Sequence, residues 1–355
     1  MSKGECMKKK IAVIFGGEST EHEVSVVSAT SVIKHLDKEK YSILPVYIGK
    51  EGQWYYYTKP IEEIDVVSIG TLPKEIEKID NVLEILQEVD VVFPVLHGLY
   101  GEDGTVQGML ELIGKPYVGC KVLASSVAMD KVYTKIILRH VGIAQVKHYY
   151  IRKEKQGYYW VDTDYRGSLR EIAEKLTENM AFPMFVKPCN SGSSVGVSRV
   201  GTVSEMVKAI EMAAKYDKKI LVEQGVVGRE LECAVLGNEE VKASTVGEIQ
   251  AADTFYSFDA KYKKKESMTH IPADITVEQK QKIQEMAIKA FKAIDGSGLA
   301  RIDFFLENET GRIFLNEINT LPGFTTISMY PKLWEAEGIS YPELLDTLIQ
   351  LAEEA

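Results

Sequence analysis

Cysteine is scarce in this sequence of 355 residues, and no two cysteines stand close together. The four positions are Cys6, Cys120, Cys189 and Cys233. Disulfide-stapled domains and zinc knuckles need several cysteines at short spacings such as CxxC, and these spacings are missing here. We therefore expect free thiols rather than a disulfide framework or a zinc site.

Long apolar runs and an excess of positive charge are also missing. No segment offers the roughly 18 consecutive apolar residues of a membrane span, and the start, MSKGECMKKK, lacks the apolar stretch of a signal peptide. The residues before Met7 are assigned no role. Asp and Glu outnumber Lys and Arg by 52 to 42, and the net charge of -10 argues against binding to nucleic acid or anionic lipid. We expect a cytoplasmic enzyme that binds neither membranes nor nucleic acid.

Several well-known site motifs are absent as well. GGESTEHEVS contains the pair Gly16 and Gly17 but not the GxGxxG of a dinucleotide site. The loop after Lys187 does not have the GxxxxGK[ST] spacing of a Walker loop. No HExxH helix and no ordered set of Ser, His and Asp offers another chemistry. Any bound phosphate must therefore be held by a different arrangement.

What the sequence does contain is the alternation of strands and helices typical of an α/β protein. KKIAVIF reads as a buried strand before a glycine turn and a helix, and DVVFPVLHG leads in the same way into GEDGTVQGMLELIG. This alternation predicts a parallel sheet covered by helices. Near residue 120 the pattern changes to LASSVAMDKVYTKIILRHVG, which reads as a helix, and the length predicts two or three domains.

A hairpin near the C-terminus carries acidic side chains. LARIDFFLE and GRIFLNEIN read as strands joined by a short polar turn. Alternation groups two sets of side chains, each on one face of its strand: Arg301, Asp303 and Phe305, and Leu315, Glu317 and Asn319. If the hairpin is symmetric about Thr310, Asp303 lies opposite Glu317. Opposed carboxylates repel unless a cation lies between them, and with Asn319 they would suit Mg²⁺. Alternation alone leaves an ordinary solvated face equally open.

Two further segments allow both a functional and a structural interpretation. Lys187 ends an apolar strand before the loop NSGSSVG, whose backbone N–H groups could bind phosphate, although a flexible hairpin loop has the same composition. Thr20 and Glu23 can form a capping box at the start of the first helix. Glu21, between them, could instead hold the ammonium group of a substrate.

His97 and the lysines of FDAKYKKKES also allow both a functional and a structural interpretation. His97 follows a strand, where open sheets often bind ligands, yet a lone histidine is more often structural. Lys261 and its neighbours could close over phosphates as a lid or form a solvated loop.

Eight segments in this order closely resemble the D-alanine:D-alanine ligases of the ATP-grasp superfamily: GGESTEHEVS, LHGLYGEDG, MDK, VKPCNSGSSVGVS, VEQGVVGRE, AKY, ARIDFF and NEINTLPGFTTISMYP. The match spans nearly the whole chain. The resemblance implies an α/β chain with the three-domain ATP-grasp fold. Its parts would be a Rossmann-like, substrate-binding domain over residues 1–120, a central domain over 121–223 and a C-terminal domain with the metal site over 224–355.

The activity implied by this resemblance is the ATP-dependent joining of two D-alanines through an acyl phosphate, for peptidoglycan precursor synthesis. Two Mg²⁺ ions would take part, with Mn²⁺ as a possible substitute, and a monovalent cation is also possible. The family further suggests a homodimer.

Matching positions imply the nucleotide contacts. Lys131 and Lys187 match groups that contact the ATP phosphates, and Lys261 belongs to the loop that closes over the site. Glu223 with its neighbouring backbone matches the group that reads adenine, and Glu230 the group that holds the ribose. The ligands of the two magnesium ions are matched by Asp303, Glu317 and Asn319.

The amino-acid contacts follow from the same resemblance. Glu21 matches the group that binds the ammonium of the first D-alanine, with Ser193 and Tyr262 hydrogen-bonded to it, and His97 lies nearby in the family.

Three more positions concern the reacting carbonyl and the second substrate. Arg301 and the backbone of Gly323 match groups that stabilise the developing oxyanion. Ser328 matches a contact to the carboxylate of the second substrate.

Some choices remain open in the sequence. Ser191 stands where many relatives have Glu, so no contact is inferred for that side chain. A ligase that joins D-alanine to D-serine or D-lactate is the nearest alternative. Tyr262 argues against lactate, and Ala260, where serine-using relatives often have Glu, favours alanine. A nucleotide-binding regulator without turnover is a third possibility, against which the complete set of acid and arginine positions speaks.

Overall fold

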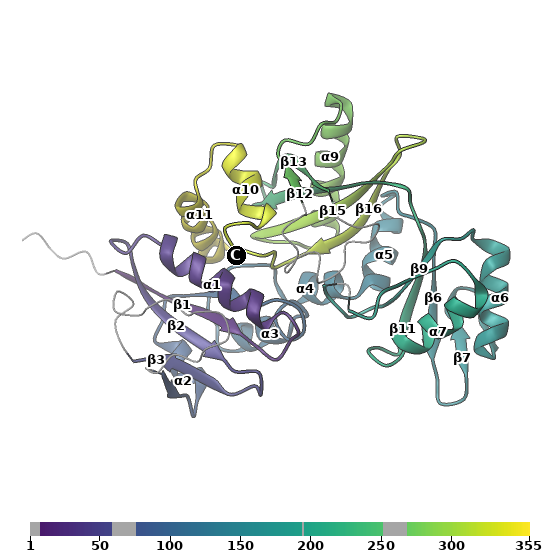
Figure 1. The fold of residues 1–355 in the computed structure, drawn as a ribbon. Coiled ribbons are helices and arrows are strands. Elements are labelled where there is room, and N and C mark those ends of the chain that lie inside the picture. Colours follow the sequence, from purple (N-terminus) through teal and green to yellow (C-terminus); the bar gives the residue numbers. More distant parts are fainter. Residues whose placement is uncertain (1–7, 59–75, 194, 251–267) are drawn as a thin grey trace, which may run out of the picture.

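The computed structural model describes residues 8–58, 76–193, 195–250 and 268–355, and three β-sheets run through them (Figure 1). The first sheet has the order β4 (Ile76–Lys78), β3 (Trp54–Tyr57), β2 (Tyr41–Ile48), β1 (Lys9–Gly16) and β5 (Val91–Val95). The second has the order β10 (Ser198–Val200), β9 (Met184–Pro188), β11 (Lys219–Gln224), β6 (His148–Lys153), β7 (Tyr158–Trp160) and β8 (Tyr165–Gly167). The third has the order β14 (Met268–His270), β13 (Lys242–Gln250), β12 (Gly228–Leu236), β15 (Leu299–Glu307) and β16 (Ile313–Asn319). The predicted site residues Lys261 and Tyr262 lie outside the described residues.

The helices cover these sheets. Those of the first half of the chain are α1 (His22–His35), α2 (Val82–Gln87), α3 (Thr105–Leu112), α4 (Val122–Met129) and α5 (Lys131–His140). Those of the second half are α6 (Leu169–Asn179), α7 (Val203–Ala213), α9 (Val277–Ala293), α10 (Met329–Ala336) and α11 (Tyr341–Glu354). No helix within the described ranges is both long enough and apolar enough to cross a membrane.

The first sheet is parallel at its centre and antiparallel at one edge. β1 runs parallel to β2 and β5, whereas β3 runs antiparallel to β2 and β4. Ile11 and Val13 of β1 pack with α1 and α11, and Ala12 and Ile14 pack with α2 and α3, so both faces of the strand are buried. The predicted parallel sheet is confirmed for the centre and wrong for the edge, because a short connection after β2 can only form a hairpin.

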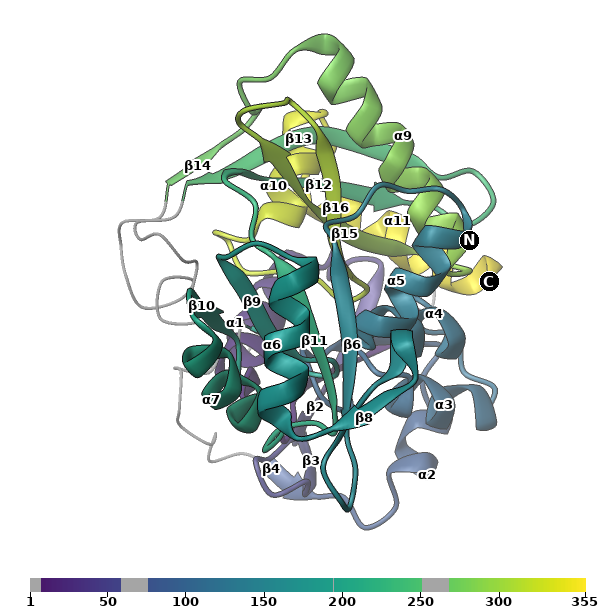
Figure 2. The ribbon, with the colours of Figure 1, turned by 90° about the vertical axis from the view of Figure 1, so that its right-hand side faces the viewer.

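The second and third sheets are antiparallel throughout. Helices α6 and α7 cover one face of the second sheet and lie in front of it in Figure 2. Helices α4, α5 and α9 share a core with one face of the third sheet, and α10 packs on the other face near β12 and β13. The rest of that second face carries polar side chains.

The segment LASSVAMDKVYTKIILRHVG forms two helices, where one was predicted. The break falls at Asp130, whose carboxylate accepts hydrogen bonds from the backbone N–H groups of Val132 and Tyr133 and so caps α5. An aspartate that binds these free N–H groups favours a new helix start over a continuous helix. This start brings Lys131 to the first position of α5.

At its acidic end the hairpin has the register that symmetry about Thr310 predicted. Asp303 lies opposite Glu317, and Arg301 lies opposite Asn319. Arg301 and Asp303 are partly exposed on one face of β15, and the residues between them and on either side are buried.

A β-bulge separates this part of the hairpin from the turn. Closer to the turn the register shifts by one residue, so that Phe304 pairs with Leu315 and Asn316 is the extra residue. Leu315 and Ile318 both pack into the core with α9, while Glu317 faces the other way. The prediction that Leu315 shares a face with Glu317 is wrong, because the bulge resets the alternation of β16.

The chain passes from the second sheet to the third in the bend around Gly225, between β11 and β12. Two features cross the limits predicted for the domains. Helices α4 and α5 share their apolar core with the third sheet, and α11 returns to pack on the first. The domain limits themselves stay a prediction.

Candidate active site

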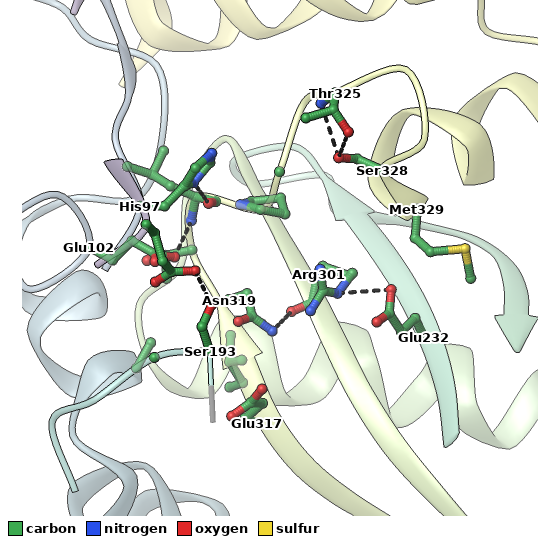
Figure 3. A pocket seen from close by; sticks show the side chains of 18 of the residues that line it. His97, Glu102, Ser193, Glu232, Arg301, Glu317, Asn319, Thr325, Ser328 and Met329 are labelled. Carbon is green, nitrogen blue, oxygen red and sulfur yellow. Dashed lines mark hydrogen bonds and ion pairs between the residues drawn. The ribbon is translucent and has the colours of Figure 1, made fainter. Parts of the chain in front are cut away.

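A cavity of about 400 Å³ lies where loops of the first two sheets meet the polar face of the third (Figure 3). The predicted site residues that line it are Glu21, His97, Lys131, Ser193, Arg301, Glu317, Asn319, Gly323 and Ser328. Four other described candidates do not line it, namely Lys187, Glu223, Glu230 and Asp303. The described chain thus gathers most of the predicted set from segments far apart in the sequence.

Glu21 and Ser193 meet in this cavity. Glu21 is only 8% exposed, and its Oε1 accepts a hydrogen bond from the Ser193 hydroxyl. Its Oε2 lies so close to Gly98 and Gly192 that a Cβ atom at either position would stand 2.7 Å away. Glycine at both positions lets the backbone approach the carboxylate, which a larger side chain would have to displace.

The predicted capping box of Thr20 and Glu23 is wrong. Helix α1 begins at His22, with Glu21 in the N-cap position, and no side chain within the described residues caps it. A capping box needs its acid three positions after the N-cap, and Glu23 is one position short. Glu23 forms an ion pair with Lys50 instead, at 2.6 Å.

His97 joins the loop after β5 to the loop after β16. Its Nδ1 lies 3.0 Å from the carbonyl oxygen of Leu321, and its Nε2 lies 3.1 Å from the hydroxyl of Ser28. A carbonyl only accepts, so Nδ1 donates to it and Nε2 accepts from Ser28, whose oxygen in turn accepts from the backbone N–H of Phe324. Burial lowers the pKa of His97, which favours this neutral, bridging form.

Glu102 is a cavity residue that the sequence analysis missed. Its Oε2 accepts from the N–H of Gly98 at 2.7 Å, and its Oε1 accepts from the N–H of Leu321 at 3.2 Å. Burial and the nearby charge of Glu21 raise the pKa of Glu102 to about 8. The only signal in the sequence was its place within LHGLYGEDG.

Arg301 is held by two carboxylates. Its Nε and Nη2 donate to the two oxygens of Asp303, each at 2.7 Å, and its Nε lies 3.0 Å from Glu232. Although burial opposes its charge, Asp303 and Glu232 raise the pKa of Arg301, so that it stays a cation. Figure 3 shows Arg301 between Glu232 and the side chain of Asn319.

Glu232 is the second residue that the sequence analysis missed. It stands opposite Asp303, which stands opposite Glu317, so that three carboxylates form a row across β12, β15 and β16. The row could not be found from spacing along the chain, because β12 is far from the hairpin in sequence.

The donor atoms of the hairpin fit a hard cation that takes further ligands from elsewhere. Asn319 donates its amide to Asp303 at 3.0 Å, and the two residues with Glu317 offer carboxylate and amide oxygens on one face. Within the described residues, no group of three or more His, Cys, Asp or Glu side chains is arranged to hold a metal alone. Mg²⁺ commonly binds one or two carboxylates and completes its shell with water and phosphate, so the set suits this ion.

Two cationic side chains stand on the side of the second sheet. Lys131 lines the cavity and donates to the carbonyl oxygen of Ser191 at 2.7 Å. Lys187, on β9, forms an ion pair with the buried carboxylate of Glu223 on β11. The other oxygen of Glu223 lies 2.5 Å from Lys135 of α5, a buried lysine that the sequence analysis did not consider.

Gly323 and Ser328 line the end of the cavity at the start of α10. The Ser328 hydroxyl accepts from the N–H of Thr325 at 3.0 Å and lies 2.8 Å from the Thr325 hydroxyl. A Cβ atom on Gly323 would stand 2.8 Å from this hydroxyl. Glu230, by contrast, stands on β12 opposite Phe305 and lies outside the lining.

A partly parallel sheet beside two antiparallel sheets, with a cavity lined by carboxylates and cations, is the architecture of an ATP-grasp ligase. Two family models match the chain, that of the D-ala D-ala ligase N-terminus over residues 10–120 and that of the D-ala D-ala ligase C-terminus over residues 137–350. The chain belongs to the D-alanine–D-alanine ligase family.

Curated relatives agree with this assignment. The D-alanine–D-alanine ligase of Acetivibrio thermocellus is 48% identical over 97% of this chain and 96% of the relative. That of Clostridium acetobutylicum is 48% identical over 98% of both chains.

Solved structures are similar over almost the whole chain. The D-alanine–D-alanine ligase of Coxiella burnetii has a TM-score of 0.81 and 37% identity, and covers 98% of this chain and 94% of its own. A D-Ala:D-Ser ligase from Enterococcus faecalis has a TM-score of 0.84 and 38% identity, with 98% and 100% coverage. The ligase of Bacillus anthracis, solved with ATP, has a TM-score of 0.74 and 28% identity, with 98% coverage of both chains.

Proposed function

We propose that this chain joins two molecules of D-alanine into D-alanyl-D-alanine and converts ATP to ADP and phosphate in the same cycle. The observation that carries the proposal is the 48% identity with a named D-alanine–D-alanine ligase over 97% of the chain. The cavity supports it, because one space holds carboxylates, a paired arginine and a backbone loop.

The reaction follows from the poor reactivity of a carboxylate as an electrophile. The carboxylate of the first D-alanine attacks the γ-phosphate of ATP, which yields an acyl phosphate and ADP. The amine of the second D-alanine then attacks the acyl carbon, and phosphate and a proton leave. Arg301 and the backbone N–H of Gly323 stabilise the oxyanion that forms in this second step.

The two amino acids are held at opposite ends of the cavity. Glu21 binds the ammonium of the first D-alanine, and Ser193 orients Glu21 through the hydrogen bond between them. We assign Tyr262 to the same group, although it lies outside the described residues. Ser328 binds the carboxylate of the second D-alanine, and His97 acts as a nearby support rather than as a proton carrier, because both of its ring nitrogens are engaged.

ATP lies between the second and third sheets in this proposal. Lys131, Lys187 and Lys261 contact its phosphates, and Glu230 holds its ribose. Adenine is read by the backbone beside Glu223, since the carboxylate of Glu223 already holds two lysines.

Two Mg²⁺ ions, or Mn²⁺ in their place, complete the site in this proposal, with Asp303, Glu317 and Asn319 as their ligands. Bound there, the ions neutralise the charge of the transferring phosphoryl group. A monovalent cation also belongs to the proposal, without assigned ligands.

The cellular setting is proposed from the reaction. The dipeptide would serve peptidoglycan precursor synthesis in the cytoplasm, and the active form would be a homodimer. We also propose the division into domains at residues 1–120, 121–223 and 224–355.

A coupled assay of ADP release tests the activity. We expect release that depends on D-alanine and is absent with L-alanine. ADP release without any dependence on D-alanine would overturn the proposal.

D-Serine as the second substrate is the alternative that a specific observation favours, since the D-Ala:D-Ser ligase of Enterococcus faecalis has a TM-score of 0.84. Mass analysis of the products from an equal mixture of D-alanine, D-serine and D-lactate separates the candidates. We expect D-alanyl-D-alanine to dominate, and a dominant D-alanyl-D-serine product would establish the alternative.

A further inference from the structure

Three charged side chains form a buried triad beside the cavity, and one of them has no part in the roles given above. Glu223 of β11 lies between Lys187 of β9 and Lys135 of α5, with one carboxylate oxygen toward each lysine. The exposed fractions of the side chains are 4% for Glu223, 3% for Lys135 and 13% for Lys187. Lys135 is thus the most deeply buried member, and Lys187 is the one nearest to solvent.

The triad carries one positive charge in excess, since two lysines share one carboxylate. Although burial opposes its ionisation, the two lysines lower the pKa of Glu223, so the carboxylate stays charged. Burial lowers the pKa of Lys135, whereas Glu223 raises the pKa of Lys187 against the effect of burial. Lys187 is therefore a firmly charged lysine with its ammonium held against Glu223.

Lys187 has two possible partners if it contacts a phosphate of ATP. In the structure its ammonium is bound to Glu223, and a bound phosphate would compete for it. A buried carboxylate that loses its only cation is strongly destabilised, because it cannot recover water. Lys135 removes this penalty, since it keeps its own contact with the other oxygen of Glu223 at 2.5 Å.

We propose that Lys135 is a positioning residue for nucleotide binding, which acts through Glu223 and lets Lys187 turn from the carboxylate toward an ATP phosphate. The inference rests on the proposed function, in which Lys187 binds phosphate. Lys135 itself does not touch the nucleotide. Its role is to keep Glu223 neutralised in both positions of Lys187.

Two variants and one binding measurement test this proposal. Isothermal titration with ADP in the presence of Mg²⁺ gives Kd without turnover. Lys135→Met removes the charge, keeps most of the length of the side chain and leaves a balanced pair of Glu223 and Lys187. We expect its Kd for ADP to rise about tenfold or more, because Lys187 is then the only cation among the described residues that pairs with Glu223.

The double variant Lys135→Met, Glu223→Gln should bind ADP almost as tightly as the unchanged chain, because position 223 then has no carboxylate to compete with phosphate for Lys187. A structural role of Lys135 does not predict this recovery. An unchanged Kd in the single variant, or a double variant that binds no better than the single one, would overturn the proposal.

Lys121→Met is the control, because Lys121 is a partly buried lysine near an acid, Glu111, at 3.9 Å, and lies outside the cavity lining. It should leave the Kd unchanged. Thermal unfolding of each variant reports on the fold. Failure of the unchanged chain to bind ADP would contradict the proposed function, whereas equal binding by the chain and its Lys135→Met variant would contradict this inference alone.

Discussion

The contacts of Arg301 depend on the planar shape of its guanidinium group. Two parallel hydrogen bonds to Asp303 and the contact with Glu232 fix the direction in which the group points. A lysine ammonium carries the same charge but cannot make a two-pronged contact with a carboxylate. A charge-preserving substitution therefore tests orientation apart from charge.

Arg301→Lys should lower kcat by about 100-fold to 1,000-fold, because a misplaced donor no longer meets the oxyanion of the second step. The KM for ATP should change much less. Steady-state kinetics measures both quantities. Arg229→Lys is the control, since Arg229 makes a similar paired contact with Glu248 away from the cavity. An Arg301→Lys variant with an undiminished kcat would contradict the oxyanion role.

Glu317→Gln should reduce turnover by about 100-fold or more, because the amide removes one of the two negative charges that face the proposed Mg²⁺ ions. The fold should persist, since Glu317 is partly exposed to the cavity. Activity as a function of Mg²⁺ concentration and thermal unfolding provide the two measurements. Glu309→Gln in the exposed turn is the control. Unchanged turnover in Glu317→Gln would show that the metal assignment is wrong.

At the scale of elements, helix α11 packs the C-terminal end of the chain against the first sheet. Its residues Leu344, Leu345 and Leu348 are buried in the core that contains β1, β5 and α1. Two ion pairs at the rim, of Lys9 with Glu353 and of Lys40 with Asp346, are partly exposed and add little. Apolar packing is thus the main force that holds α11 on the first sheet.

Leu348→Ala should lower the free energy of unfolding by about 2–5 kcal/mol, through lost burial and the cavity left behind. Leu112→Ala, at a position that is 90% exposed, should change it by less than about 0.5 kcal/mol. Urea unfolding followed by circular dichroism compares the two. Equal stabilities would mean that α11 does not contribute to the core of the first sheet.

Across the whole molecule, the loops after β5 and β16 form a connection between the first and third sheets. His97 binds the carbonyl of Leu321 and Glu102 binds its N–H, so both backbone groups of one residue are held. Gly323, two residues later, supplies the proposed oxyanion contact. The position of Gly323 in the cavity therefore depends on how the first sheet packs against the third.

The raised pKa of Glu102 gives this connection a dependence on pH. Its pKa rises from the ordinary value of 4.5 to about 8, so the folded chain binds the proton more tightly than the unfolded chain does. The contribution of this group to the free energy of unfolding is therefore full below pH 4.5 and is lost as the pH rises to about 8. Glu102→Gln removes this titration, so its stability should fall less between pH 5 and pH 8 than that of the unchanged chain. Thermal unfolding across this pH range, with Glu111→Gln as a control, checks the difference. Identical slopes would contradict a raised pKa.

The sequence by itself determined which strands exist in the acidic hairpin and which of their side chains lie together near the site. Alternation with a period of two is a local property of an extended chain, so Arg301, Asp303, Glu317 and Asn319 could be grouped without coordinates. The buried strand of KKIAVIF was predictable from its continuous apolar run, and the parallel centre of the first sheet from the alternation of strands with helices. The resemblance to the D-alanine:D-alanine ligases added the expected three-domain fold and the expected residue roles.

Tertiary structure alone decided the contacts between distant segments. The bulge at Asn316, the row that adds Glu232 to the hairpin and the place of Glu102 against Leu321 depend on how separate elements dock. The break at Asp130, by contrast, is a local N-cap, because its carboxylate binds the N–H groups of the next helical turn. Local patterns indicate which face a side chain takes along a regular strand or helix, whereas its partners across the cavity are chosen by long-range packing, which no spacing along the chain encodes.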